Sequence, residues 1–336
     1  MAEWLCSGLQ LRVHRFDSVL SLHIMRILIT GTAGFIGFHL TKKLLEMGHE
    51  VTGLDNINDY YSTSLKLHRL SILQTHRFNF HKTDINNIDS VKPKFDLAIN
   101  LAAQAGVRVN KDKEPYFQTT NVNGFKKFMK YCSDNSINKI IYASSSSVYD
   151  DSSNVEFTEN DTDLKPKSIY GKTKLFNETY ADKFKMDLDC LGLRFFSVYG
   201  PLGRPDMAYY SFTESLKKAE EIKLNNAGSM KRDMTYIDDA VNGIICSINF
   251  LMNSKGVKNE IFNIGNGFPI STNELLREIE RNLNLKAKIK AVKVSNESKY
   301  THANLKKSRK ILGYNPIVSF EVGIKRFLDW HKSFEK

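Results

Sequence analysis

The sequence predicts an α/β fold: a doubly wound parallel sheet with a smaller mixed α/β lobe at its C-terminal side. Two observations indicate the sheet. From Met25 onward, short apolar segments rich in β-branched residues alternate with amphipathic helical segments, which is the pattern of βαβ units. A glycine-rich turn also joins the first of these strands to the first helix. A third observation indicates the lobe, because beyond Ser197 the spacing of the segments becomes irregular.

The strands expected in the sheet are short apolar segments. They are residues 26–30, 50–55, 77–84, 95–103, 139–144 and 188–196. Helical stretches lie between them, the clearest being residues 35–47 and the segment that begins near Lys167. Because strands and helices alternate, the strands are expected to run parallel.

Beyond Ser197, a loop-like stretch leads to short strands that are expected in the smaller lobe. These strands are residues 221–226, 260–265 and 287–292. We predict a sheet domain over residues 25–196, to which residues 236–260 return, and a lobe that takes up most of residues 197–336. Residues 1–24 have no charged segment followed by a long apolar one, as a secretory signal would. We expect them to be a poorly ordered leader, with a weak targeting or anchoring peptide as the alternative.

Composition and charge disfavour several classes of protein. The chain of 336 residues has a formal net charge of +11 at pH 7, but its lysines are scattered and no basic block is interleaved with aromatic residues. We therefore expect no nucleic-acid partner. No apolar run approaches the roughly 20 residues needed to cross a bilayer, so no membrane partner is expected. The four cysteines stand far apart and the nine histidines show no metal-ligand spacing, so we predict a cytoplasmic protein without a structural metal.

The first candidate site is the turn "ITGTAGFIG". Gly31, Gly34 and Gly37 follow a strand and open a helix at G-x-x-G-x-x-G spacing. Glycines there allow a sharp turn and let a pyrophosphate approach the helix N-terminus, where free N–H groups and the dipole favour anions. Asp55, at the end of the second strand, can accept both ribose hydroxyls of an adenosine and would repel a 2′-phosphate. The pattern predicts a Rossmann-type sheet that binds NAD rather than NADP, with Asp84 expected at the adenine edge.

The second candidate site is the pair Tyr170 and Lys174 in "SIYGKTK". The two stand four residues apart, so they lie on one face of a helix. An ammonium beside a phenol favours the phenolate, and lowering a tyrosine pKa from about 10 to about 7 requires roughly 4 kcal/mol. The lysine, the positive nicotinamide ring and a ribose hydroxyl could together supply this stabilisation. An ordinary exposed tyrosine–lysine pair has the same spacing, so the interpretation of Tyr170 and Lys174 as catalytic depends on the other motifs.

The third candidate site is a run of four serines after the apolar segment "INKIIYA". The run consists of Ser144, Ser145, Ser146 and Ser147. Ligands of parallel α/β sheets bind beyond the carboxyl ends of the strands, so these hydroxyls are expected at the same site. Small hydroxyls can line a sugar pocket without filling it, and one of them can pass a substrate proton toward Tyr170.

These motifs together resemble the extended short-chain dehydrogenase/reductase family. Within it, the chain is similar to nucleotide-sugar epimerases, and most of all to UDP-glucuronate 4-epimerases. The resemblance runs from Met25 nearly to the C-terminus. It is carried by "GFIGFHL", "LDNINDYY", "LAAQAGVR", "YASSSSVY", "LRFFSVYGPLGRPDMA", "KRDMTYIDDAVNGI" and "FNIGNG".

The resemblance implies roles for the candidate residues. Tyr170 would be the base and acid at the sugar 4-hydroxyl, Lys174 would hold the ribose and tune Tyr170, and Ser145 matches the family's catalytic Ser/Thr. NAD would further contact Phe35, Ile36, Ile85, Leu101, Ala102, Ala103 and Asn121. The UDP-sugar would contact Ser144, Ser146, Ser147, Ser197, Arg204 and Arg232.

A homodimer is also implied, because the helix with the Tyr-Lys pair and the helix after Asn121 usually pair with their copies in this family. The second of these helices carries Phe125, Phe128 and Met129 at helical spacing. These side chains fit either the dimer interface or the core of one chain.

Three departures from the family pattern concern the substrate site. Asp150 replaces the glycine that usually follows "VY", and Ser197 replaces a threonine. Residues 296–304 depart from the usual "GDV…T…AD", with Glu297 and Asn304 in place of aspartates. These changes concern nucleotide and sugar contacts of the lobe, and they leave the redox core as it is in the family.

The expected activity is NAD-dependent 4-epimerisation of UDP-glucuronate to UDP-galacturonate through a 4-keto sugar. The family's dehydratases carry Asp-Glu where Ser146 and Ser147 stand, and its decarboxylases usually carry a glutamate in place of Ser147. The serines therefore favour an epimerase. The alternatives are a 4-epimerase of UDP-glucose or UDP-N-acetylglucosamine, a UDP-glucuronate decarboxylase, and a non-enzymatic NAD-binding regulator. The Tyr170–Lys174 pair argues against the regulator.

Overall fold

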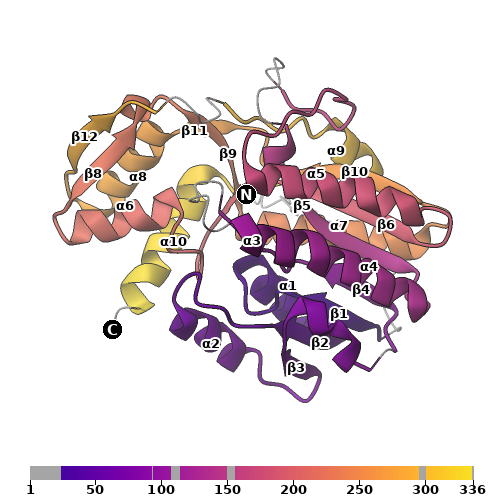
Figure 1. The fold of residues 1–336 in the computed structure, drawn as a ribbon. Helices are drawn as coiled ribbons and strands as arrows, with labels where there is room; N and C mark the ends of the chain where they lie inside the picture. Colours follow the sequence, from indigo (N-terminus) through magenta and orange to yellow (C-terminus); the bar gives the residue numbers. More distant parts are fainter. Residues whose placement is uncertain (1–23, 93, 107–113, 150–155, 295–299, 335–336) are drawn as a thin grey trace, which may run out of the picture.

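The computed structural model describes residues 24–92, 94–106, 114–149, 156–294 and 300–334 (Figure 1). The expectations for residues 1–23, for Asp150 and for Glu297 lie outside the described residues.

The centre of the molecule is a seven-stranded parallel sheet with the order β10-β6-β5-β4-β1-β2-β3. Its strands are β1 (Arg26–Thr30), β2 (Glu50–Asp55), β3 (Phe78–Lys82), β4 (Leu97–Asn100), β5 (Lys139–Ser145), β6 (Asp189–Phe195) and β10 (Asn259–Ile264). The six strands expected in the sheet are all confirmed, with shifted ends. The strand order reverses between β1 and β4, which is where ligands bind in open sheets of this kind.

One expectation was wrong: residues 260–265 were assigned to the smaller lobe, but strand β10 belongs to the central sheet. The strand instead pairs in parallel with β6, with Phe262 opposite Leu193. It follows the helix α7 (Ile237–Asn253), whose buried side packs in the main core. A crossover helix followed by a parallel strand is one more βαβ unit, and Phe262 and Ile264 are fully buried in it.

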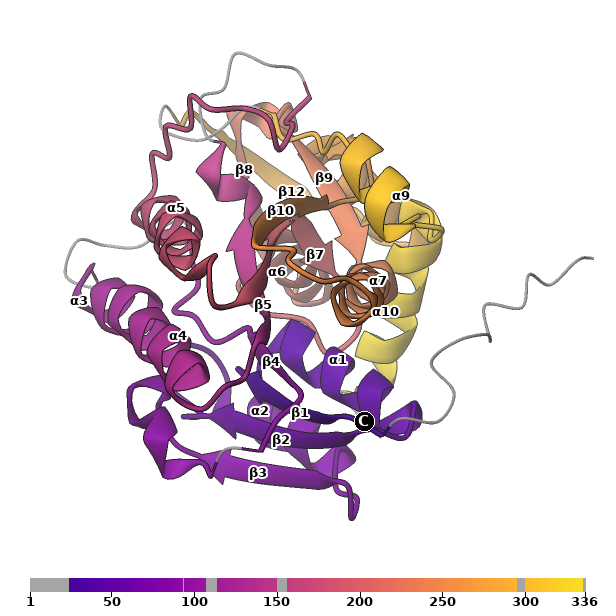
Figure 2. The same cartoon turned by 90° about the vertical axis from the view of Figure 1, so that its right-hand side faces the viewer.

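Helices cover both faces of the sheet (Figure 2). One face carries α1 (Phe35–Glu46) and α7. The other carries α3 (Glu114–Phe117), the π-helix η3 (Gln118–Gly124), α4 (Phe125–Asp134) and α5 (Ile169–Ala181). The helix α2 (Thr63–Ile72) packs near the edge strand β3, and the 3-10 helix η1 (Ile85–Ser90) packs against α4.

Side chains of β1 alternate between these two layers, as the pleat of a strand requires. Ile27 and Ile29 belong to the core that contains α1 and α7, and Leu28 belongs to the core on the other face. The second core also contains Phe125, Phe128 and Met129, all nearly inaccessible to solvent. These three residues are therefore core residues of one chain.

The smaller lobe lies beside the carboxyl ends of the strands (Figure 1). Its strands are β7 (Ser197–Tyr199), β8 (Glu221–Asn225), β9 (Lys231–Tyr236), β11 (Pro269–Ser271) and β12 (Lys288–Val292). They form a three-stranded sheet, β11-β9-β7, and a parallel pair, β12-β8. Its helices are α6 (Ala208–Lys217) and α8 (Thr272–Leu283), and α9 (Lys306–Leu312) and α10 (Phe320–Phe334) follow. The strands expected at residues 221–226 and 287–292 are confirmed.

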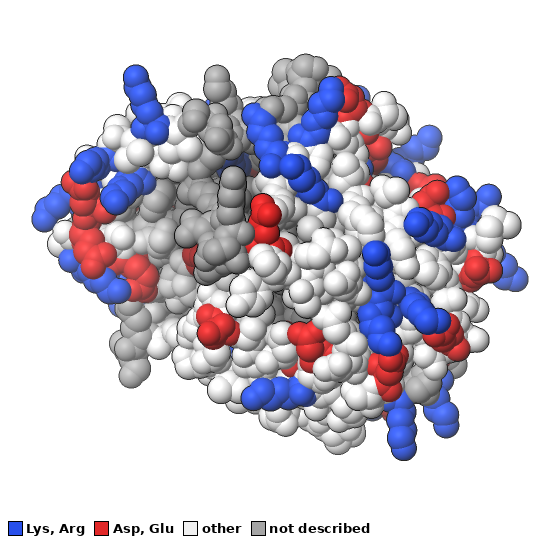
Figure 3. Space-filling view, viewed as in Figure 1, with Lys and Arg blue, Asp and Glu red and all other residues white. Residues whose placement is uncertain are grey.

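None of the helices in the described part of the chain is long and apolar enough to cross a membrane. On the face shown in Figure 3, lysine and arginine side chains are spread over several places with acidic side chains nearby.

Candidate active site

A cavity of about 1220 Å³ lies between the carboxyl ends of the sheet strands and the smaller lobe. It is lined by nearly all the site residues that the sequence predicts. They are Gly31, Gly34, Phe35, Ile36, Gly37, Asp55, Asp84, Ile85, Leu101, Ala102, Ala103, Ser144, Ser145, Ser146, Ser147, Tyr170, Lys174, Ser197, Arg204 and Arg232. Of the predicted residues, Asn121 is absent from this lining.

The glycine turn packs too closely for larger residues. Gly31 has φ +79°, and a Cβ there would lie 2.7 Å from the backbone nitrogen of Ala102. A Cβ on Gly37 would lie 2.1 Å from the carbonyl oxygen of Gly31. Helix α1 begins after Gly34 without a side-chain cap, so its first N–H groups are left for a ligand at this end. The turn therefore has the form of an anion site at the mouth of a helix.

Asp55 lies at the end of β2. It accepts hydrogen bonds from the backbone N–H of Ala33 at 3.1 Å and of Ile57 at 2.8 Å. Each oxygen accepts one of these bonds, so acceptor sites remain for ribose hydroxyls. Burial raises the pKa of Asp55, while the two N–H groups and the charge of Lys66 act to lower it.

Asp84 begins η1 and accepts hydrogen bonds from the backbone N–H of Asn86 at 2.9 Å and from the Asn56 amide at 2.8 Å. Burial acts to raise the pKa of Asp84, but the hydrogen bonds lower it overall. This carboxylate therefore also joins the ends of β2 and β3.

Asn121 lies behind the cavity wall, buried in the π-helix η3. Its side chain accepts from the backbone N–H of Gln104 at 2.7 Å and donates to the carbonyl oxygen of Gln104 at 3.0 Å and to Thr173 at 3.0 Å. The amide thus joins the loop after β4 to α5, one residue before Lys174. Its part in cofactor binding would be to hold that loop in place.

Tyr170 and Lys174 project from the first turns of α5, whose N-cap is Ser168. The Lys174 ammonium donates to the carbonyl oxygen of Ala143 at 2.9 Å and lies 5.6 Å from the centre of the Tyr170 ring. Burial lowers the pKa of Lys174 to about 8, against the attraction of Glu178.

The pKa of Tyr170 is expected to fall only where the lysine, the nicotinamide ring and a ribose hydroxyl act together. Burial raises it, while the charge of Arg204 and the hydroxyl of Ser145 act to lower it. In the protein alone, burial outweighs these two groups. The lysine is turned toward the carbonyl oxygen of Ala143, so a lowered tyrosine pKa needs the cofactor's positive charge as well.

The four serine hydroxyls differ in their contacts. Ser144 is buried and donates to the carboxylate of Glu178 at 2.5 Å. Ser145 ends β5, where its hydroxyl interacts with the Tyr170 phenol and accepts from the backbone N–H of Ser147 at 3.1 Å. Ser146 and Ser147 begin the short 3-10 helix η4 (Ser146–Val148) on the cavity wall. All four residues line the cavity, although the hydroxyl of Ser144 is bonded to Glu178.

Arg204 reaches the cavity from the loop over residues 200–206. Its guanidinium binds both oxygens of Asp206, at 3.0 and 2.5 Å, and Asp206 also accepts from the Tyr60 hydroxyl at 3.2 Å. The charge of Arg204 acts on Tyr170. Arg232, on β9, lines the cavity from the smaller lobe and donates to the carbonyl oxygen of Lys231 at 2.9 Å.

Two side chains that are not among the predicted site residues hold this loop. Arg69 of α2 is fully buried and donates to the carbonyl oxygen of Ala33 at 2.8 Å. It also donates to two carbonyl oxygens of the loop, and His39 of α1 bonds a third. Those three carbonyl groups belong to Pro201, Leu202 and Gly203.

Asn304, one of the departures from the family pattern, uses its amide within the chain. Its oxygen accepts from the backbone N–H of Lys306, at the start of α9, at 3.0 Å. Its nitrogen donates to Glu156 at 2.7 Å. Among the residues that the structure describes, no group of three or more His, Cys, Asp or Glu side chains is arranged to hold a metal ion.

Comparisons with known proteins show which family and which individual proteins the chain is similar to. The model of a family described as the NAD dependent epimerase/dehydratase family matches residues 27–265. The chain is 41% identical over 315 residues to an uncharacterised protein of Methanocaldococcus jannaschii, covering 90% of this chain and 95% of that protein. It is 37% identical over 329 residues to UDP-glucuronate 4-epimerase 4 of Arabidopsis thaliana, covering 92% of this chain and 75% of that protein.

The structure is similar to that of UDP-glucuronic acid 4-epimerase from Bacillus cereus in complex with UDP-glucuronic acid and NAD. The TM-score is 0.85 at 31% sequence identity, covering 92% of this chain and 100% of that chain. The predicted resemblance to nucleotide-sugar epimerases is thus confirmed. On its sequence and its fold, the chain belongs to the NAD dependent epimerase/dehydratase family.

Proposed function

We propose that this protein is an NAD-dependent 4-epimerase of UDP-sugars that converts UDP-glucuronate to UDP-galacturonate through a 4-keto sugar. The observation that carries the proposal is that a single cavity is lined by both the glycine turn and the Tyr170–Lys174 pair. A dinucleotide site and an acid–base group must share one space if a sugar hydroxyl is to be oxidised and reduced again. Relatives that are named UDP-glucuronate 4-epimerases support the choice of sugar.

The residues present fit NAD. The uncapped start of α1 would hold the pyrophosphate, and the remaining acceptor sites of Asp55 would hold the adenosine ribose. Lys174 would hold the nicotinamide ribose. When bound, NAD supplies a group that accepts a hydride from the sugar and returns it. The cavity exceeds the roughly 300–1,000 Å³ typical of a small-molecule pocket, so its 1220 Å³ suits two ligands.

The protein's own part in the chemistry is to move a proton and to orient the sugar. Tyr170 as phenolate would take the proton of the sugar 4-hydroxyl, and the Ser145 hydroxyl beside it would bridge the two oxygens. Lys174 and Arg204 would stabilise the phenolate by their positive charge. After the 4-keto sugar turns in the cavity, Tyr170 would return the proton. Such an acid–base group contributes about 10²–10⁴-fold to a rate.

The positions of the carboxylates that line the cavity favour an epimerase over a dehydratase or a decarboxylase. Among the described residues, those that line it are Asp55, Asp84, Glu114 and Asp206. Asp55 and Asp84 lie at the strand ends near the glycine turn, Asp206 is bound by Arg204, and Glu114 is exposed at the start of α3. The wall beside Tyr170 carries hydroxyls from Ser145 to Ser147. Hydroxyls suit the carboxylate of a uronic acid, which a neighbouring carboxylate would repel.

We further infer that the two parts of the chain bind different ligands. Residues 25–196, together with residues 236–260, would hold NAD, and most of residues 197–336 would hold the UDP-sugar. We also propose a homodimer, because the family resemblance implies one. Light scattering at micromolar concentration should give twice the mass of the chain, and a monomer mass would contradict the dimer.

The activity is tested by incubating the purified protein with a panel of UDP-sugars and separating the products by chromatography. We expect UDP-galacturonate from UDP-glucuronate and slower reaction of UDP-glucose and UDP-N-acetylglucosamine. Equal or faster turnover of a neutral UDP-sugar would contradict the proposed substrate. Release of CO₂ with formation of a UDP-pentose as the main product would identify a decarboxylase instead.

A further inference from the structure

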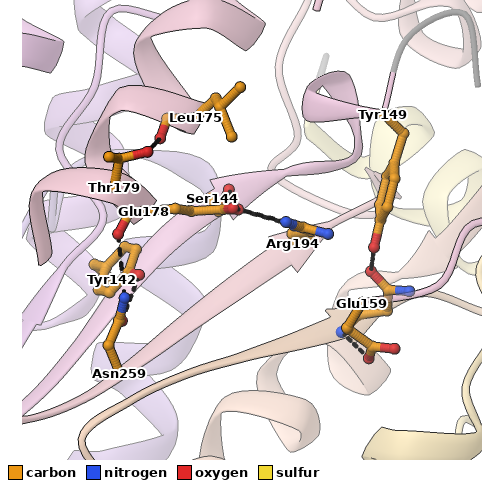
Figure 4. A network of polar contacts seen from close by, with 10 residues as sticks. Tyr142, Ser144, Tyr149, Glu159, Leu175, Glu178, Thr179, Arg194 and Asn259 are labelled. Atoms are coloured by element: carbon orange, nitrogen blue, oxygen red, sulfur yellow. Dashed lines mark hydrogen bonds and ion pairs between the residues drawn. The ribbon is translucent and has the colours of Figure 1, made fainter. Parts of the chain in front are cut away.

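A buried carboxylate lies directly behind the lysine of the candidate site. Glu178 stands one helical turn after Lys174 on α5 and is 7% exposed. It accepts hydrogen bonds from the Arg194 guanidinium at 2.9 and 2.7 Å and from the Ser144 hydroxyl at 2.5 Å (Figure 4). None of the motifs that predict the site includes Glu178, and Arg194 lies in the stretch "LRFFSVYGPLGRPDMA" without a role assigned to it.

Glu178 and Lys174 hold two consecutive residues of β5. Lys174 donates to the carbonyl oxygen of Ala143, and Glu178 accepts from the hydroxyl of Ser144. The next residue is Ser145, whose hydroxyl interacts with Tyr170. The two contacts therefore join α5 to the end of β5 at the place where the acid–base residues meet.

Three charges are buried together at this point. Lys174 is 1% exposed, Arg194 3% and Glu178 7%. Burial disfavours the charged form of each, and opposite charges at short range restore it. Glu178 is the acidic group whose charge favours the ammonium form of Lys174. Arg194, from β6, neutralises part of that effect because it binds both oxygens of the carboxylate.

The remaining polar groups around Glu178 are neutral or lie farther along the network. Tyr142 of β5 donates its hydroxyl proton to Asn259 of β10, and the Asn259 amide donates to the backbone carbonyl oxygen of Glu178. Arg194 lies over the ring of Tyr149 at 4.6 Å. Glu159 accepts from the backbone N–H of Asn263, on the far side of Tyr149. Glu178 is thus the charged group that acts on Lys174, and Arg194 is the charged group bound to Glu178.

We propose that Glu178 is a positioning residue that keeps Lys174 charged and holds Ser145 beside Tyr170, and that Arg194 limits the strength of this effect. The proposal rests on the proposed function only in taking Tyr170 and Lys174 as the reacting pair.

The pair of opposite charges gives a test by sign. Glu178→Gln keeps the shape and removes the negative charge, so Lys174 should lose its proton at a lower pH. Arg194→Gln removes the competing positive charge, so Lys174 should lose its proton at a higher pH. For Glu178→Gln we expect a change of about one pH unit, a tenfold change in the protonation equilibrium. A purely structural role would reduce the stability of both variants without opposite changes at Lys174.

The titration of Lys174 can be followed directly by NMR on the full-length protein that contains isotope-labelled lysine. The Lys174 signal is the one that disappears in Lys174→Arg. Glu159→Gln is the matched control, since it removes a carboxylate of the same network that does not face Lys174. Glu178→Asp should shift the Lys174 titration in the same direction as Glu178→Gln but by less. The charge remains in this variant, on a side chain that is shorter by one methylene group. This variant also serves if Glu178→Gln does not fold.

The second readout is the pH profile of kcat/KM with UDP-glucuronate. Its alkaline limb should move to lower pH in Glu178→Gln, move to higher pH in Arg194→Gln and stay in place in Glu159→Gln. An unchanged Lys174 titration in Glu178→Gln, or the same direction of change in both charge variants, would overturn the proposal. The NMR titration needs no substrate, so an absence of activity toward UDP-glucuronate would refute the proposed function and leave this test intact.

Discussion

The Arg69 guanidinium donates two hydrogen bonds to the carbonyl oxygen of Leu202, at 3.1 and 2.6 Å. Leu202 has φ +56°, a left-handed conformation that is unfavourable for a leucine. Surrounding contacts must therefore hold the backbone of this loop. Because Arg69 also bonds Ala33 of the glycine turn, one side chain fixes the loop of Arg204 relative to the turn that is proposed to bind NAD.

Arg69→Met should loosen this loop and weaken substrate binding. The substitution leaves several carbonyl oxygens without donors, so we expect the free energy of unfolding to fall by about 2–4 kcal/mol. KM for UDP-glucuronate should rise more than kcat falls, because Arg204 is displaced while Tyr170 and Lys174 stay on α5. Urea unfolding and steady-state kinetics test both effects. A normal KM in a destabilised variant would show that the hydrogen bonds of Arg69 serve folding alone.

Tyr170→Phe tests the acid–base role. The variant should keep its fold and its ability to bind NAD, while turnover falls by about 10²–10⁴-fold because the proton has no carrier. Tyr180→Phe is a suitable control, since Tyr180 lies on the same helix and its ring stacks on Phe176 at 5.6 Å. Near-normal turnover in Tyr170→Phe would remove this residue from the mechanism.

His39 predicts a dependence of stability on pH. Its ring bonds the carbonyl oxygen of Pro201 at 2.9 Å, and burial lowers its pKa from 6.5 to about 4. Between these two values the unfolded chain binds more protons than the folded one, so this residue's contribution to stability is present above pH 6.5 and is lost as pH falls toward 4.

The size of the effect follows from linkage. Between pH 7 and pH 5, His39 should lower the free energy of unfolding by about 2 kcal/mol. Urea unfolding of His39→Gln at both pH values isolates this contribution, because glutamine can donate to Pro201 and does not titrate in this range. Equal pH dependence of the two proteins would show that His39 does not lose stability in this way.

The local patterns of the sequence were sufficient to predict most of the fold. Strand β1, the glycine turn and α1 are neighbours in the chain, and their residue types fix the turn and the buried faces. The assignment of β10 to the smaller lobe was wrong because that choice depends on how α7 returns to the sheet. A strand of six residues carries no signal for the sheet to which it pairs.

The candidate site could be predicted where a motif places its members on adjacent turns or strand ends, as for Tyr170 and Lys174. The supporting residues could not be predicted in this way. Arg69 bonds Leu202, which is 133 residues away in the chain, and Glu178 of α5 bonds Arg194 of β6, which is 16 residues away. A buried charge has no sequence signature until the fold places its partner beside it. The same holds for Asn121, which was expected to contact NAD. Its bonds to Gln104, which make it a support for the cavity wall, depend on how the fold places the two residues.

The serine run gives the last prediction, because a single charge there should separate the candidate substrates. Ser147 lines the cavity at the start of η4, beside Ser145 and Tyr170. Ser147→Glu would bring a carboxylate to the wall that is proposed to meet the sugar. Two like charges about 5 Å apart repel by roughly 3 kcal/mol at an effective dielectric constant of 20. KM for UDP-glucuronate should therefore rise at least about tenfold.

Ser147→Gln provides the matched control, because glutamine has the shape of glutamate without its charge. Both variants should slow the turnover of any UDP-sugar to a similar extent through bulk, so the difference between them isolates the charge. That difference should be large for UDP-glucuronate and small for UDP-glucose, whose C5 substituent is neutral. If Ser147→Glu and Ser147→Gln raised KM for UDP-glucuronate equally, the uronic acid carboxylate would not face the serine run, and the hydroxyls could not be what selects the acidic sugar.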